Sequence, residues 1–269
     1  MEKYNKTKVN LMKAIAVIFE ITFNQTIKSK KTIFMVMLAF LPVFLTLYFR
    51  LAQPNHIVSP SFVLLSVMSF FLLFVSMLVA LFYGTSIIGD EIDNKTITYL
   101  FTRPIPKYII AIGKFCAYLV GVFLILIPPI MISFLIILSD SRMAGDYSYT
   151  VDTFANQLGV ILLALIVYGA IFMFFGSRLK HPVIAGMLLA FGWEKITLIV
   201  PGIIRKFSVV HYLISAFPVA PEMQNALDEM SKGASSSLAT SLIMIAIITV
   251  VFWGLTIFTL YNKEYKFDS

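Results

Sequence analysis

The stretch SFVLLSVMSFFLLFVSMLVALFYGTSII, residues 61–88, carries no charged side chain. A helix of about 20 residues crosses the hydrocarbon core of a bilayer, so this run is long enough to span it. Five further apolar runs are long enough to cross, at 32–49, 115–139, 154–177, 183–204 and 238–261. The pattern predicts an all-α integral membrane protein with six transmembrane helices. Pro128 and Pro129 predict a kink or break in the third helix, because proline removes a backbone donor.

The composition excludes a soluble enzyme. Hydrophobic residues make up 59% of the 269 residues. Charged residues make up 13%, about half of the roughly 25% found in soluble domains. The mean hydropathy is +0.90. The net charge of +7 is carried mainly at the flanks of the apolar runs, which argues against a nucleic-acid partner.

The sequence shows no pattern typical of a catalytic or metal site. The single cysteine, Cys116, excludes an internal disulfide. The three histidines, at 56, 181 and 211, lack the spacing of a metal site, and no catalytic residue can be nominated. Gly84 and Gly89 have the spacing of a phosphate-binding loop, but Asp90 stands where its lysine would be. We therefore expect no ATP hydrolysis by this chain alone.

Lysine and arginine predict the orientation, because they are enriched in cytoplasmic flanks. Fifteen of them fall on the side of the N-terminal segment 1–31 and the tail 262–269, and six on the other side. Both termini are therefore expected in the cytoplasm, below a plasma or inner membrane. The connection 205–237 would lie outside, although Arg205 and Lys206 do not fit this rule. Its apolar piece, 209–217, is too short to cross, and either lies in the outer leaflet or re-enters it.

Residues 11–28 predict an amphipathic helix before the first span. Lys13, Glu20, Asn24 and Lys28 fall along one line of a helix, while apolar side chains face elsewhere. Such a helix lies in the cytoplasmic interface or packs on another cytoplasmic protein.

The segment 84–114, GTSIIGDEIDNKTITYLFTRPIPKYIIAIGK, is the most informative connection. Here the second span is expected to end at Gly89, and Asn94 to cap a short helix that stops before Pro104. That helix would carry three apolar side chains on one face, those of Ile97, Leu100 and Phe101. It is either a docking element for a soluble partner or a turn whose apolar residues dip into the interface.

The same stretch resembles the signature of ABC transporter permeases of the ABC-2 type. The signature has a Glu after the second span, a Thr, a Leu, an Arg-Pro-Ile segment and a Gly-Lys at the next span. The matching positions are Glu91, Thr96, Leu100, Arg103, Pro104, Ile105, Gly113 and Lys114. The family usually has Gly-Thr in mid-motif, where this chain has Lys95–Thr96.

The resemblance implies the membrane subunit of an ATP-driven transporter, usually an exporter. Two permease chains, identical or related, would form the path, and a separate ATPase subunit would hold ATP and Mg. The segment 89–107 would couple the two, with its contacts made by Glu91, Ile97, Leu100, Phe101 and Arg103. A secondary transporter, a polytopic membrane enzyme and a membrane scaffold that senses a ligand remain the alternatives.

Glu194 and Lys195 interrupt the fifth predicted span. At 1.5 Å per residue, Glu194 would lie roughly 16 Å from Val183, near the midplane of the bilayer. Adjacent helical residues point about 100° apart, so the two side chains do not simply neutralise each other. Either the helix breaks at Gly192–Trp193 beside a wet cavity, or Glu194 faces the bundle interior. Glu194 is a candidate for the translocation path; the alternatives are a structural polar contact or a span that ends earlier.

Overall fold

The computed structural model describes residues 11–52, 59–94, 106–139, 147–200, 203–218 and 236–262. In this part of the chain, five helices are long and apolar enough to cross a membrane. They are α2 (Lys30–Ala52), the continuous rod of α3 (Pro60–Phe70), η1 (Phe71–Val75) and α4 (Ser76–Asp93), α6 (Lys107–Leu138), α7 (Tyr147–Arg178) and α12 (Leu238–Asn262). The all-helical membrane fold is therefore confirmed.

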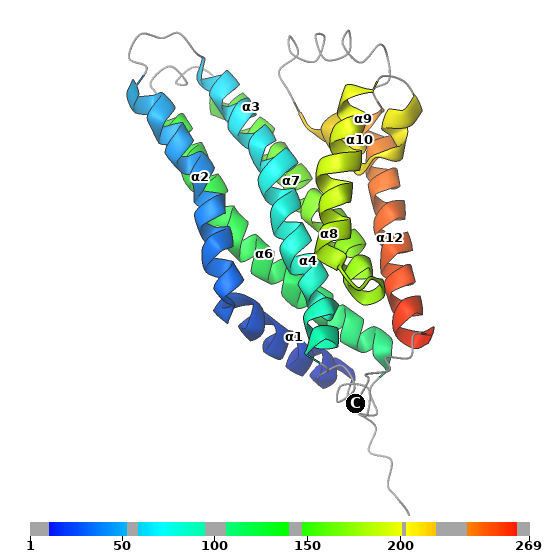
Figure 1. Ribbon diagram of the computed structural model, residues 1–269. Coiled ribbons are helices and arrows are strands. Elements are labelled where there is room, and N and C mark those ends of the chain that lie inside the picture. The colour runs from blue at the N-terminus through cyan, green and yellow to red at the C-terminus, as the bar shows by residue number, and fades with distance from the viewer. Residues whose placement is uncertain are drawn as a thin grey trace, which may run out of the picture.

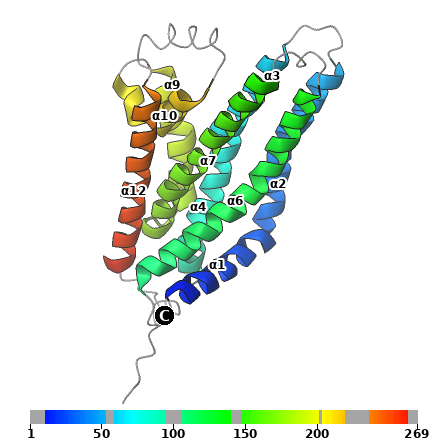
Figure 2. The same cartoon turned by 180° about the vertical axis from the view of Figure 1, so that it is seen from behind.

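The helices form a bundle with α4 and α7 packed against each other (Figures 1 and 2). Glycines allow this close approach, as is usual between membrane helices. A Cβ on Gly176 would clash with the backbone carbonyl of Thr85 in α4, and one on Gly169 with the ring of Tyr118 in α6. The Tyr118 hydroxyl donates to the carbonyl of Leu165 at 2.9 Å, which satisfies its polar group inside the core.

The fifth predicted span is a composite helix. It consists of α8 (Pro182–Met187), the π-helical turn η3 (Leu188–Trp193) and α9 (Glu194–Ile199). These elements follow one another between the two ends of the bundle (Figure 1). The helix does not break at Gly192–Trp193, where η3 leads directly into α9. The predicted end at 204 is wrong, because Val200, which precedes a proline, has an extended backbone (φ −80°, ψ 120°).

The chain after α9 folds back on the bundle. A short 3₁₀ helix, η4 (Ile203–Phe207), precedes α10 (Val209–Ala216). Most side chains of α10 are buried, and the helix packs against α12, α9 and α7. The apolar piece at 209–217 is thus covered by protein of this chain.

Two further expectations concern helix bounds. Of the kink or break expected in the third span, the break does not occur, because α6 continues through Pro128 and Pro129, with Pro129 buried. A kink there stays a prediction. Membrane helices tolerate proline where neighbouring groups satisfy the freed backbone. The helix before the motif does not end at Gly89, since α4 continues to Asp93. Asn94 is the C-cap of α4, and the short helix it was expected to begin lies outside the described residues.

The helix expected over 11–28 is present as α1 (Leu11–Lys28). It crosses beneath α2 and α6 at the end of the bundle where α12 also ends (Figure 1). Ala14 and Ile18 form a small apolar cluster with Ile109 and Ile110 of α6. This face of α1 is therefore bound to the protein's own bundle, while Met12 and Ile21 are exposed. An interfacial position in the membrane stays a prediction.

Candidate functional site

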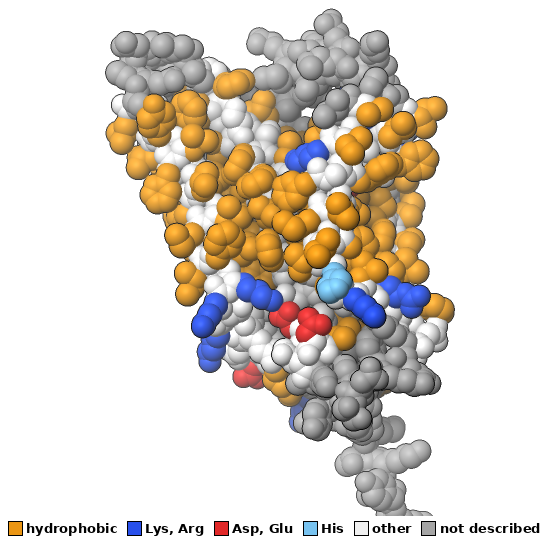
Figure 3. All heavy atoms as spheres, in the orientation of Figure 1, with side chains coloured by type: hydrophobic (Ala, Val, Ile, Leu, Met, Phe, Trp, Pro, Cys, Tyr) orange, Lys and Arg blue, Asp and Glu red, His pale blue; other side chains and the backbone are white. Residues whose placement is uncertain are grey.

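Charged side chains gather where α1, the last turn of α4 and the first half of α6 meet. In the space-filling view, a row of charged side chains crosses the molecule directly below the apolar band (Figure 3). A cavity of about 90 Å³ lies among these elements. The polar residues among those that line it include Thr22, Gln25, Ser29, Lys31, Ser86, Asp90, Glu91 and Lys114.

One ion pair at this site joins a buried lysine to a partly buried glutamate. The ammonium of Lys114 in α6 lies 2.6 Å from Glu91 Oε1 in α4 and donates to the carbonyl of Ile87 at 3.0 Å. The side chain of Lys114 is 4% exposed and that of Glu91 is 21% exposed. A buried charge such as that of Lys114 is tolerated only with close pairing and additional hydrogen bonds, and both are present here. The pair fastens the end of α4 to α6.

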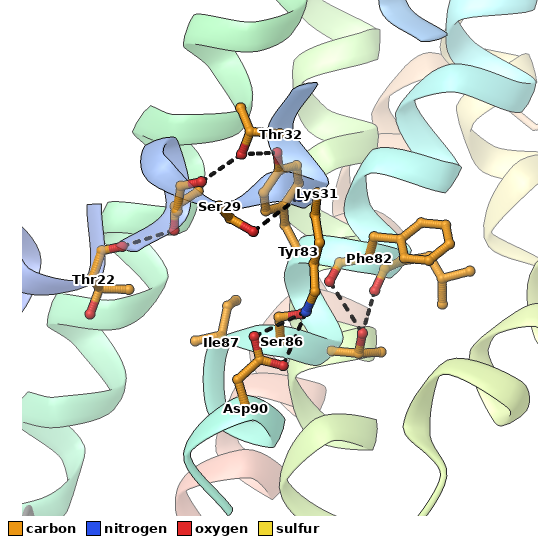
Figure 4. A network of polar contacts seen from close by, with 12 residues as sticks. Thr22, Ser29, Lys31, Thr32, Phe82, Tyr83, Ser86, Ile87 and Asp90 are labelled. Carbon is orange, nitrogen blue, oxygen red and sulfur yellow. Dashed lines mark hydrogen bonds and ion pairs between the residues drawn. The ribbon is translucent and has the colours of Figure 1, made fainter. Parts of the chain in front are cut away.

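A second ion pair fastens the start of α2 to the same turn of α4. Lys31 Nζ lies 3.0 Å from Asp90 Oδ2 and donates to Ser86 Oγ at 2.9 Å (Figure 4). Both charged side chains are about half exposed, at 46% and 52%. Asp90 and Glu91 therefore bind partners on two different helices. The two lysines also compensate acidic residues at a helix C-terminus, where the helix dipole disfavours negative charge.

Hydroxyl groups continue the network into the bend between α1 and α2. Tyr83 donates from its hydroxyl to Thr32 Oγ1 at 2.7 Å, and Thr32 donates to the carbonyl of Thr26 at 2.6 Å (Figure 4). Thr26 in turn donates to the carbonyl of Thr22 at 2.9 Å. The bend that redirects the chain from α1 into α2 is thus held by α4.

Two residues of the predicted motif have a structural explanation. A Cβ on Gly113 would lie 3.0–3.1 Å from side-chain atoms of Ile18, so the glycine lets α1 approach α6 closely. Lys114 is the partner of Glu91, which was predicted as a coupling residue. The remaining motif positions, Thr96, Leu100, Arg103, Pro104 and Ile105, lie outside the described residues. The predicted coupling residues Ile97 and Phe101 lie outside them too.

Glu194 forms a second, separate polar site at the opposite end of the bundle. Its side chain is buried, and the residue is 1% exposed. Glu194 Oε1 accepts the backbone N–H of Val209 at 3.2 Å, and Oε2 accepts that of Val210 at 3.0 Å. Ser208 caps the next N–H of α10, that of His211, at 3.1 Å. The carboxylate thus compensates the positive N-terminus of α10.

Lys195 binds a different helix from Glu194, as the angular separation of adjacent residues predicts. Its ammonium donates to the carbonyl of Leu73 in η1 at 3.0 Å. Glu194 faces the bundle interior, one of the arrangements expected from the sequence, and its contacts with α10 are those of a structural polar group. A place for Glu194 on the translocation path stays a prediction.

His211 predicts a pH dependence of stability at this end. The residue is 9% exposed, and burial, followed by nearby Arg205 and Lys206, lowers its pKa below the usual 6.5. The unfolded chain therefore binds a proton at a higher pH than the folded chain. The free energy of unfolding is unaffected above pH 6.5 and falls as the pH drops through the folded-state pKa.

We expect the melting temperature of the purified protein to fall between about pH 7.5 and about pH 5.5, and to fall less in His211→Gln. Thermal melting of both proteins in one detergent measures the difference. Parallel curves over this range would contradict the prediction.

In the described part of the chain, no three His, Cys, Asp or Glu side chains lie close enough to hold a metal ion. Both sites consist of ion pairs and hydrogen bonds that join different helices. Lys31, Ser86 and Asp90 were missed as site residues, because their contacts join positions 55 to 59 residues apart. The clustering of basic residues before the first span was the one available signal.

A sequence model of ABC-2 family transporter proteins matches residues 25–193. The match covers more than half of the chain and includes both ion pairs and four of the five long apolar helices. No curated protein matches the sequence. The match and the helical membrane architecture agree with the motif at 84–114, and the chain belongs to the ABC-2 family of transporter proteins, as a multi-pass membrane permease.

Proposed function

We propose that the chain is the transmembrane subunit of an ATP-driven exporter in a cell membrane, coupled to a separate ATPase subunit through segment 89–107. The observation that carries this proposal is the buried pair between Glu91 and Lys114. It joins the two helices from which the central part of the segment leaves, after Asn94, and to which it returns, before Pro106.

The ion pairs supply a path for force. A displacement of the segment acts on the last turn of α4 and on the first half of α6. The ion pair of Asp90 with Lys31 transmits the displacement from α4 to α2. The close approach of Gly113 to Ile18 transmits it from α6 to α1. Short charge-assisted bonds resist separation in a way that isolated apolar contacts do not. Four helices would therefore move together when a partner pushes on the segment.

The partner's contacts are assigned to Glu91, Ile97, Leu100, Phe101 and Arg103. Apolar side chains would fill a cleft of the ATPase, while charged groups fix the register. ATP and Mg would be held by that partner.

The proposed topology has six crossings with both termini in the cytoplasm. The composite helix α8–η3–α9 supplies the crossing beyond the five long helices, since its three six-residue segments span about 27 Å at 1.5 Å per residue. In this topology α1 and the ion pairs lie on the cytoplasmic side, which the excess of lysine and arginine there supports. Six crossings are few for a complete pathway, so two such chains, identical or related, would form it.

A pull-down of the tagged chain from its native membrane, followed by mass spectrometry, tests the proposal. We expect a stoichiometric partner that carries a phosphate-binding loop, and its loss by at least tenfold in Leu100→Asp or Arg103→Glu. Leu238→Asp is the matched control, because Leu238 is 61% exposed at the opposite end of the bundle. A chain that purifies without an ATPase would instead favour a secondary transporter or a membrane enzyme.

A further inference from the structure

Two π-helical turns from different helices meet in the bundle. The turn η1 interrupts the rod of α3 and α4, and η3 interrupts α8 and α9. The rings of Phe74 in η1 and Phe191 in η3 pack edge to face, with centroids 6.1 Å apart. Lys195, directly after η3, donates to the carbonyl of Leu73 in η1. We call these contacts the π seam. π turns make up well under 1% of residues in proteins, so a contact between two is unusual.

Two side chains donate hydrogen bonds to backbone carbonyls of η1. Ser76 Oγ donates to the carbonyl of Leu72 at 2.7 Å, and Lys195 Nζ donates to that of Leu73 at 3.0 Å. Helices bend where a side chain enters the backbone ladder and where a π turn widens it. The bond from Lys195 thus lies at the point where the rod of α3 and α4 deforms most easily.

Packing differs between α8 and the π turn η3 that follows it. In α8, a Cβ on Gly186 would clash with Leu81 and lie 3.2 Å from the ring of Phe172, so this part is held against α4 and α7. Inside η3, a Cβ on Gly192 would meet no atom within 4 Å. The composite helix is therefore packed against α4 and α7 before the π turn. Within η3, Ala190 is buried and Phe191 contacts Phe74, while the side of the turn at Gly192 is open.

The part of the chain beyond η3 is tied into one body, which we call the outer cap: α9, η4 and α10. Glu194 binds the first two N–H groups of α10. Arg205 of η4 donates to the carbonyl of Leu198 in α9 at 2.8 Å, and Tyr212 of α10 donates to the carbonyl of Lys206 at 2.8 Å. With these bonds in place, α9 cannot turn without carrying η4 and α10 with it. Such a turn also slides α10 along α12 and α7, against which it packs.

We propose that the outer cap pivots as a unit at the π seam, and that the bond between Lys195 and the Leu73 carbonyl is the contact that breaks and re-forms. Glu194 is a positioning residue that keeps α10 attached to the moving helix. The proposal rests on the proposed transport function, in which such a movement changes the outer end of the path. The movement itself is a property of this chain and can be measured without an ATPase.

The test uses the full-length chain in nanodiscs, with Cys116 replaced by serine and spin labels at Ile203 and Leu238. Both labelled positions are exposed, at 75% and 61%, one in the outer cap and one at the start of α12. Double electron–electron resonance spectroscopy measures the distribution of distances between the two spin labels. A pivoting cap gives two populations of molecules, one at a main distance and one at a second distance. We expect Lys195→Met to raise the population at the second distance, relative to that at the main distance, at least tenfold. Lys28→Met, at the exposed end of α1, is the matched control and should leave the distribution unchanged.

A second variant keeps the test valid if Lys195→Met does not fold. Phe191→Ala removes the ring contact with Phe74 and should shift the distribution in the same direction. An unchanged distribution in every folded seam variant would overturn the proposal.

A cross-link separates hinge movement from general loosening. Phe74→Cys with Phe191→Cys, joined by a short bifunctional thiol reagent, should suppress the second distance. The control pair is Phe174→Cys with Phe252→Cys, whose rings lie at a similar distance of 5.7 Å between α7 and α12. Suppression by both cross-links, or by neither, would contradict a pivot at the seam. Because no ATPase is present, this outcome is independent of the pull-down that tests the proposed function.

Discussion

Gly176→Ala is expected to destabilise the protein by about 1–3 kcal/mol, the usual cost of overpacking a core. The new Cβ would clash with the carbonyl oxygen of Thr85. Because the opposing atom belongs to the backbone, no rotamer change relieves the clash, and α4 and α7 must separate. These two helices form the centre of the bundle, so the loss affects the whole fold.

Thermal melting in a mild detergent measures this effect. Gly159→Ala on the same helix α7 is the matched control, since a Cβ there meets nothing within 4 Å. Alanine is the better helix former by about 1 kcal/mol, so the control should be neutral or more stable. Equal melting temperatures for the two variants would contradict the packing of α4 on α7 described above.

Glu91→Gln should reduce stability by about 3 kcal/mol, because removal of one partner leaves a buried charge without compensation. The Lys114 ammonium would retain the carbonyl of Ile87 but lose its carboxylate at 2.6 Å. The double variant Glu91→Gln with Lys114→Met should recover much of the loss, since it removes both charges. Chemical or thermal unfolding of the three proteins gives the comparison.

The exposed pair at the same turn of α4 is the matched control. Lys31→Met should cost less than about 1 kcal/mol, because a half-exposed pair gains little over its separately hydrated charges. An effect of Lys31→Met as large as that of Glu91→Gln would show that burial does not govern these pairs. The stable double variant also allows the proposed coupling to be tested apart from folding.

The membrane spans could largely be predicted from the sequence. Four of the long helices contain predicted runs completely, because a continuous apolar stretch is a local property that depends on no distant residue. α6 contains the run at 115–139 up to Leu138 and begins earlier, at Lys107. The break at Pro128–Pro129 and the break at Gly192–Trp193 were each one of two expected outcomes, and neither occurs. α6 continues through both prolines, and the π turn η3 leads directly into α9.

The amino-acid sequence by itself determined that the chain is a helical membrane protein, where its apolar helices lie, and which family motif joins α4 to α6. Only the tertiary structure decided the partners of the charged residues: Glu91 with Lys114, Asp90 with Lys31, and Glu194 with the first turn of α10. The physical reason is that the hydropathy of an apolar run depends only on consecutive residues, so it can be calculated from the sequence. A buried charge is stabilised by groups that folding brings near it, and for Glu194 and Lys114 those groups lie 15 to 27 residues away.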